Sequence, residues 1–258
     1  MIEKYKKIRC FGSSYTEGGG YYFENIDKLS QIHKNYLNSL DEYPKEMKHY
    51  SYAGQLQKIL NENNHNVSVE NYGKCGYGND RTCRLIYEIL ENNNCENDLF
   101  LIEWASFERE EVYSNSINDY VVHIYNVNDD FSYDKGTLMK FMYDNIDLKN
   151  SEKLINDYNK EFFNFRNTID KDDMIQSFLF SYLTQKNIDF IVLSGIKDET
   201  KEIISDKNYI NFDNNHDSFL GYIIKNKLLI SDISDVHDNH VSLEGNKLIA
   251  NKIYNFIL

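Results

Sequence analysis

The chain has 258 residues and a formal net charge of −13, from 28 Lys and Arg against 41 Asp and Glu. This acidic balance argues against a protein that grips a nucleic-acid backbone or docks on anionic lipid, because both need a basic surface. Hydrophobic residues make up 41% of the chain, with 12 Gly and 1 Pro, which excludes a disordered or linker-rich protein.

Short apolar runs alternate with helical patterns, which predicts βαβ units and a parallel sheet. The third run is nearly all apolar, as expected for a strand buried on both faces. We therefore predict an α/β fold, a three-layer α/β/α sandwich with a parallel central sheet of about five strands. In chain order the predicted strands are Ile8–Phe11, Val67–Asn71, Leu99–Ile102 and Phe190–Leu193, with a weaker candidate at Leu228–Ile230.

Apolar residues at helical spacing predict helices between these strands. They cover Tyr52–Leu60, Asp80–Leu90 and a long stretch from about Ser151 to Leu183. A final helix follows Ser242, which is a good N-cap residue.

Two segments do not fit the alternation, and we interpret them as insertions at about 19–50 and 110–150 in a single domain spanning 1–258. They follow the first and third strands. Segments after strand ends often contact substrate in open α/β sheets. It is an equally good interpretation that the two insertions have no direct function.

The four cysteines are Cys10, Cys75, Cys83 and Cys95, and no pair has CxxC spacing. A zinc ribbon or redox motif is therefore not expected, and we predict reduced thiols in a cytoplasmic protein. No apolar segment follows the basic N-terminus, and no run approaches the ~18 apolar residues of a membrane span. We expect neither a signal peptide nor membrane insertion, and no cofactor or metal.

A serine-rich turn follows the first predicted strand, in residues 12–18 (GSSYTEG). Such a turn lies at the carboxyl edge of the sheet, where α/β enzymes hold their chemistry. Such a loop can present the Ser14 hydroxyl outward, with backbone N–H groups nearby to bind an oxyanion. An ordinary capping turn has the same composition, so this motif alone is weak.

A glycine-rich segment, residues 71–79 (NYGKCGYGN), follows the second strand and opens a helix. Glycines let the backbone approach a ligand closely, and the N–H of Gly76 is a candidate oxyanion donor. The glycine spacing is not that of a dinucleotide-binding fingerprint.

The third polar segment, residues 235–245 (DVHDNHVSLEG), precedes the final helix. A histidine there, His240, with an acid two residues earlier suits a general base held in its tautomer by a carboxylate. A serine nucleophile needs such a base. A polar surface loop is one alternative. A metal site formed by Asp235, His237, Asp238 and His240 is another, although its spacing matches no standard zinc pattern.

In combination the three segments resemble the SGNH (GDSL-like) hydrolase superfamily, whose fold is flavodoxin-like. The first block G-x-S-x-T-x-G, the second N-x-G-x-x-G and the fifth D-x-H are present in the family's order. The resemblance implies that Ser14 is the nucleophile, Gly76 an oxyanion donor and His240 the general base.

Two departures concern the acids. Ser13 stands where the family has the Asp of its first block. Asp238 lies two residues before His240, whereas many members have the acid three residues before. By the resemblance we assign Asp238 as the orienting acid, with Asp235 as the fallback.

The third block is degenerate: residues 104–107 (WASF) stand where the family has G-x-N-D. Ser106 falls at the position of the oxyanion-binding Asn, and losing one oxyanion donor typically costs about 10² to 10³ in rate. Trp104 and Arg109 are candidate substrate contacts. Pairing of Arg109 with Glu103 or Glu108 is the slightly favoured alternative.

The resemblance implies a serine-dependent hydrolase or O-acyltransferase that acts on a small acyl group, such as acetyl, of a carbohydrate. In this interpretation Ser14, His240 and Asp238 form and resolve an acyl-enzyme. The N–H groups of Ser14 and Gly76 and the Ser106 hydroxyl form the oxyanion hole. The expected partner is a carbohydrate or other small acyl-ester substrate, and not nucleic acid. A weakened relative that binds glycans or proteins and a metal-dependent phosphoesterase are the alternatives.

Overall fold

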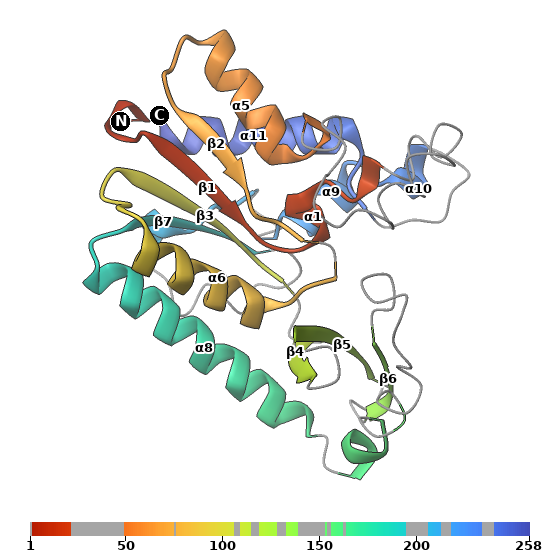
Figure 1. The fold of residues 1–258 in the computed structure, drawn as a ribbon. Coiled ribbons are helices and arrows are strands. Elements are labelled where there is room, and N and C mark those ends of the chain that lie inside the picture. Colours follow the sequence, from red (N-terminus) through yellow and green to blue (C-terminus); the bar gives the residue numbers. More distant parts are fainter. Residues whose placement is uncertain are drawn as a thin grey trace.

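The computed structural model describes residues 2–21, 49–74, 76–105, 109–114, 119–127, 133–138, 153, 156–161, 164–194, 206–212, 218–233 and 240–258. Its centre is a four-stranded parallel sheet in the order β2-β1-β3-β7 (Figure 1). The strands are β1 (Lys7–Phe11), β2 (Ser68–Asn71), β3 (Asp98–Trp104) and β7 (Asp189–Ser194).

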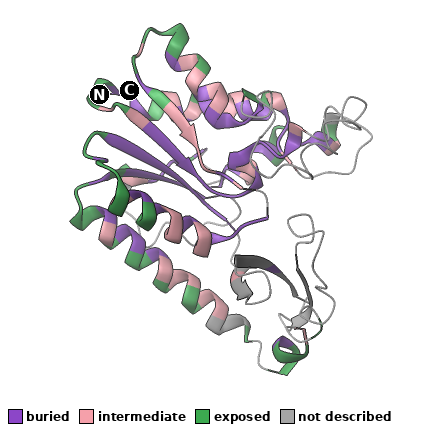
Figure 2. Ribbon diagram, viewed as in Figure 1, coloured by how far each residue is buried: buried purple, intermediate pink, exposed green. Residues whose placement is uncertain are grey.

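Helices cover both faces of this sheet, which confirms the predicted three-layer α/β architecture (Figure 1). Helices α5 (Tyr52–Glu62) and α11 (Leu243–Ile257) lie on one face, and α6 (Asn79–Asn92) and α8 (Phe165–Gln185) on the other. The side chains of a strand alternate between the two faces, so the sheet separates two cores. Ile8, Cys10, Leu99 and Leu101 pack in the first core, and Phe11, Phe100 and Ile102 in the second. Figure 2 shows strands β1, β3 and β7 buried, the edge strand β2 partly exposed and the outer helix surfaces exposed.

The segment predicted as a fifth strand, Leu228–Ile230, does not join the sheet, so this prediction is wrong. Leu229 forms an antiparallel bridge with Val241, and the short helix α10 (Ile230–Ile233) begins at once. The Asp232 carboxylate accepts a hydrogen bond from the Leu229 N–H at 3.0 Å. On the outer side of β7, Val192 forms a parallel bridge with Tyr209, in the place where the fifth strand was expected.

The long predicted helix is interrupted: residues 153 and 156–161 are helical, Asn164 is not, and α8 begins at Phe165. The predicted insertion at 110–150 contains a separate antiparallel sheet in the order β4-β5-β6. Arg84 of α6 forms an ion pair with Glu111 of β4 at 3.0 Å, which ties this sheet to the main one. Most of the predicted insertion at 19–50 lies outside the described residues.

The remaining elements among the described residues are the three strands of the second sheet and four short helices. Those strands are β4 (Arg109–Ser114), β5 (Asp119–Val127) and β6 (Tyr133–Leu138). The others are η1 (Ile2–Lys4), α1 (Ser14–Glu17), η5 (Asp206–Asn208) and α9 (Phe219–Lys225).

Three of the four cysteines are free thiols, namely Cys10, Cys83 and Cys95, while Cys75 lies outside the described residues. Burial raises the pKa of the Cys10 thiol, which keeps it protonated and unreactive. Among the described helices, none has the length and apolar character needed to cross a membrane.

A cluster of charged and polar side chains, centred on the buried Arg9, spans three strands of the sheet. The Arg9 guanidinium on β1 is 4% exposed and donates to Asp98 at 2.7 Å, to Glu70 at 2.7 Å and to the Tyr72 hydroxyl at 2.8 Å. Three neighbouring strands are therefore joined through one side chain. A buried charge without such partners would be strongly unfavourable.

We predict that Asp98→Asn lowers the free energy of unfolding by about 2–3 kcal/mol. Breaking a buried ion pair typically costs about 3–5 kcal/mol, and here Glu70 still pairs with Arg9. Urea denaturation measures the loss. Asp189→Asn is the matched control, because it removes a half-exposed pair with Lys4 and is expected to cost at most about 1 kcal/mol. Equal losses in the two variants would contradict the prediction.

Candidate active site

The predicted nucleophile, Ser14, is the first residue of α1, directly beyond the end of β1. Ser13 is extended, and α1 ends at Gly18, whose left-handed φ of 96° suits glycine. The N–H groups of Gly18 and Gly19 both donate to the Ser14 carbonyl, at 3.0 and 2.8 Å. Ser14 is 3% exposed, so the residue is buried in the turn and is not presented outward as the sequence had suggested.

A buried carboxylate, that of Glu103 near the end of β3, lies against this turn. It accepts hydrogen bonds from the Ser13 N–H at 3.2 Å, the Ser13 hydroxyl at 2.5 Å and the Thr16 N–H at 2.9 Å. The Thr16 hydroxyl also donates to it. Burial raises the pKa of Glu103, while the hydrogen bonds from Ser13 and Thr16 and the positive charge of Arg109 act in the opposite direction.

The predicted base, His240, reaches the same turn from the other end of the chain. A β-carbon placed on Gly19 would lie 3.1 Å from both Cδ2 and Nε2 of His240, and 3.2 Å from the Ser14 carbonyl oxygen. The Nε2 edge of the imidazole and the main chain of Ser14 therefore border the same small space. The Tyr15 ring packs on the imidazole, with 5.7 Å between ring centroids.

The segment wrongly predicted as a strand holds the loop of His240 in place. The Ile230 N–H donates to the His240 carbonyl at 3.0 Å, and the Ser242 N–H donates to the Leu228 carbonyl at 3.0 Å. The side chain of Ser242 caps α11 by accepting from the Gly245 N–H, as its position before the helix predicted. His240 thus lies between a short antiparallel pairing and a capped helix.

The glycine-rich loop after β2 packs directly on the Ser14 turn. Asn71 donates to the Thr16 carbonyl at 2.6 Å and accepts from the Gly73 N–H at 2.9 Å. The Lys74 N–H donates to the Gly12 carbonyl at 3.0 Å. Gly76, the predicted oxyanion donor, is buried two residues further on and has a φ of 83°.

The start of the degenerate third block is held by the side-chain amide of Asn79, at the beginning of α6. This amide accepts from the Ala105 N–H at 2.9 Å and donates to the Ala105 carbonyl at 3.0 Å. Trp104 is 5% exposed, and its indole N–H donates to Asp172 of α8 at 2.9 Å. Burial raises the pKa of Asp172, although the hydrogen bonds from Asn79 and Trp104 lower it.

Arg109, the second candidate substrate contact, begins β4 and packs against Gly78 at the start of α6. Its charge lowers the pKa of Glu103, but in the described part of the chain no ion pair joins the two side chains. Four predicted residues lie outside the described residues: Ser106, Asp235, His237 and Asp238. The predicted acid and the alternative metal site are therefore not placed by the structure.

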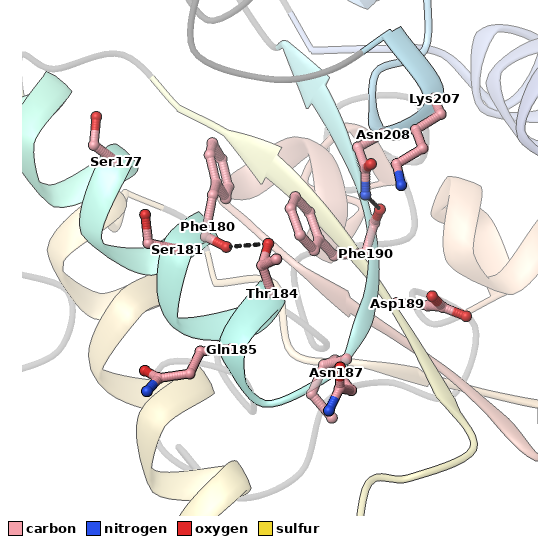
Figure 3. A pocket seen from close by; sticks show the side chains of 11 residues that line it. Ser177, Phe180, Ser181, Thr184, Gln185, Asn187, Asp189, Phe190, Lys207 and Asn208 are labelled. Atoms are coloured by element: carbon pink, nitrogen blue, oxygen red, sulfur yellow. Dashed lines mark hydrogen bonds between the residues drawn. The ribbon is translucent and has the colours of Figure 1, made fainter.

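A groove of about 960 Å³ lies elsewhere, between the end of α8 and the start of β7 (Figure 3). Its side chains are engaged within the protein: Thr184 donates to the Phe180 carbonyl at 2.8 Å and Asn208 to the Phe190 carbonyl at 2.6 Å. Since β7 begins here, this groove lies at the amino edge of the sheet, whereas Ser14 lies at the carboxyl edge.

Three residues that shape the site have no such role assigned from the sequence: Glu103, Asn71 and Asn79. Glu103 has a visible signal, because it is a charged residue within an otherwise apolar strand (LFLIEW). The two asparagines are the first and last residues of the glycine-rich segment, and Asn71 is the Asn of its N-x-G-x-x-G block. Asn71 accepts from the nearby Gly73, but its contact with Thr16 and that of Asn79 with Ala105 join distant segments, which the local sequence does not reveal.

Comparisons with known proteins find no matching family model and no matching curated protein. Among solved structures, the chain is similar to the psychrotrophic esterase EstA from Pseudoalteromonas sp., with 10% identity over 98% of this chain and 96% of that one, at a TM-score of 0.44. It is also similar to the acetyl xylan esterase AlAXEase, with 13% identity over 98% and 100% of the two chains and a TM-score of 0.43. A third is a G-D-S-L lipolytic family member from Veillonella parvula, with 12% identity over 96% of each chain and a TM-score of 0.36.

We predict that Gly73→Ala destabilises the protein by about 2–3 kcal/mol. The added methyl group would lie 2.7 Å from the carbonyl carbon and from Cβ of Thr16 and against the Glu17 N–H, so the backbone must move. Urea denaturation measures the effect. The control is Gly54→Ala in the first turn of α5, where an alanine is expected to be neutral or stabilising. An unperturbed Gly73→Ala variant would show that the glycine-rich loop does not pack on the turn as described.

Proposed function

We propose that the protein is a serine-dependent acyl-ester hydrolase or O-acyltransferase, with Ser14 as nucleophile and His240 as general base. The observation that carries the proposal is the approach of the His240 Nε2 edge to the Ser14 turn across Gly19. These two residues are 226 positions apart in the sequence, and each was selected from its own motif. A serine hydroxyl needs a base within reach, and this approach brings the imidazole of His240 to the main chain of Ser14.

In the proposed first step, Ser14 Oγ attacks the carbonyl carbon of the ester while His240 Nε2 takes the hydroxyl proton. The Nε2 edge faces the turn, so Nδ1 is left to face the acid, for which we propose Asp238. The N–H groups of Ser14 and Gly76 and the Ser106 hydroxyl are the proposed donors to the tetrahedral oxyanion. The imidazolium then protonates the departing alkoxide oxygen, and an acyl-enzyme remains.

In the second step an oxygen nucleophile attacks the acyl carbon of the acyl-enzyme, with His240 taking its proton and returning it to Ser14 Oγ. Water gives hydrolysis, and a sugar hydroxyl gives O-acyl transfer. We propose a small acyl group, such as acetyl, on a carbohydrate, on the basis of the motif resemblance. The net charge of −13 favours a substrate that is not strongly anionic. A cytoplasmic location would suit modification of sugars before export.

The decisive prediction concerns covalent labelling by a fluorophosphonate probe, read by intact mass. The wild-type protein is expected to gain one phosphonyl group, and Ser14→Ala none. His240→Ala should react about 10² to 10⁴ times more slowly, because general base catalysis contributes that factor. A chelator should leave the rate unchanged.

A folded wild-type protein that does not react would overturn the esterase proposal in favour of a glycan- or protein-binding module. Labelling lost on chelation would point to the metal-dependent alternative. Circular dichroism of every variant separates loss of reactivity from loss of fold.

We further predict that Gly19→Ala slows labelling about 3- to 10-fold without unfolding the protein. The added methyl group lies 3.1 Å from His240 Nε2, so the imidazole must shift by a few tenths of an ångström. A displacement of about 1 Å at a catalytic centre costs about 10² in rate, and a smaller shift costs less. Gly54→Ala again serves as the control. Unchanged labelling would show that the ring seen beside Gly19 does not act on Ser14.

A further inference from the structure

We infer that Glu103 is the positioning residue of the Ser14 turn. Its buried carboxylate binds the main chain on both sides of Ser14, through Ser13 and Thr16, and thereby fixes where the Ser14 hydroxyl is presented. The inference rests on the proposed function in one respect, namely that Ser14 is the nucleophile. The hydrogen bonds that define the turn can be tested separately.

The contacts of Glu103 converge from residues that flank Ser14. Oε2 accepts from the N–H groups of Ser13 and Thr16, at 3.2 and 2.9 Å, and Oε1 accepts from the Ser13 hydroxyl at 2.5 Å. Glu103 is 0% exposed, so water cannot take over these bonds. Because a buried N–H without an acceptor is costly, the turn depends on this carboxylate to keep its shape.

Gly12 provides the room for the carboxylate. A β-carbon on Gly12 would lie 2.5 Å from Glu103 Oε2 and 2.6 Å from Glu103 Cβ, and the φ of Gly12 is 154°. The end of β1 can therefore approach β3 only because residue 12 has no side chain. The position of the Glu103 carboxylate therefore requires a glycine at residue 12.

The geometry requires an acceptor more than it requires a charge. The two main-chain donors meet at Oε2, which the oxygen of a glutamine amide can replace. The amide nitrogen would then face the Ser13 hydroxyl, which can accept as well as donate. A leucine of similar size offers no acceptor at all. Glu103→Gln and Glu103→Leu thus separate hydrogen bonding from charge and from bulk.

The matched control is Asp98→Asn, at the other end of the same strand. Asp98 is a buried carboxylate too, 6% exposed, but it serves Arg9 and makes no contact with the Ser14 turn among the described residues. Its loss is expected to destabilise the protein without changing the turn. This control therefore shows how much of any change in labelling or hydrogen exchange comes from a lower free energy of unfolding alone.

Two measurements test the inference: the rate of fluorophosphonate labelling, and hydrogen–deuterium exchange of the peptide covering residues 12–18. Glu103→Leu is expected to label about 10² times more slowly and to lose protection in that peptide, because the nucleophile is displaced. Glu103→Gln is expected to keep protection and to label within about threefold of wild type. Asp98→Asn should retain both properties.

The inference is overturned if Glu103→Leu keeps wild-type protection of residues 12–18, or if Asp98→Asn slows labelling as much as Glu103→Leu. If Glu103→Leu does not fold, the double variant Ser13→Ala, Thr16→Val takes its place. It removes the two hydroxyl donors to Glu103 and keeps the main-chain donors, and Tyr52→Phe is its control because Thr16→Val also breaks the hydrogen bond between Thr16 and the Tyr52 hydroxyl. The double variant should label about 3 to 10 times more slowly than wild type, because it displaces Ser14 less than Glu103→Leu does. Unchanged labelling would count against the inference.

A wild-type protein that resists labelling, with the turn still released by Glu103→Leu, would support the positioning role and reject Ser14 as nucleophile. Failure of the proposed function and failure of this inference therefore give different results.

Discussion

The candidate site depends on one constraint: the carboxylate of Glu103 is fully buried at the end of β3 and must find its hydrogen-bond donors inside the protein. It finds them in the turn that follows β1, in Ser13 and Thr16. The register of the sheet places Phe11 beside Ile102, one residue before Glu103, so the turn begins where the carboxylate lies. Strand pairing and side-chain chemistry thus specify the same conformation of the turn.

Two other loops, the one after β2 and the one that carries His240, can approach this turn closely because glycines lie at the contacts. Gly73 lets the loop after β2 lie against Thr16, and Gly19 leaves space in which the edge of His240 faces the main chain of Ser14. Each approach joins segments that are far apart in the sequence. A larger residue at either position would push one of these segments away from the turn, which explains why glycines gather around the serine.

The sequence predicted the main sheet well, because β3 and β7 are buried and carry clear apolar runs, while β1 has Arg9 between apolar residues and is recognised from its short run ending at Gly12. It failed at Leu228–Ile230, where an apolar run pairs with Val241 and starts a short helix instead of joining the sheet. An apolar run indicates burial, but it does not identify the partner. The same limit applies to the site: motifs indicated Ser14 and His240, whereas the contacts of Glu103 depend on strand register.

Strand β3 carries a buried acid at each end, and the two are satisfied by different means. Asp98 pairs with the guanidinium of Arg9, a strong interaction between opposite charges. Glu103 is held by neutral N–H and O–H donors, whose directions matter as much as their strength. The charged pair joins neighbouring strands and tolerates small shifts. The directional set of hydrogen bonds fixes the angle of the turn, which is what the proposed role of Ser14 as nucleophile requires.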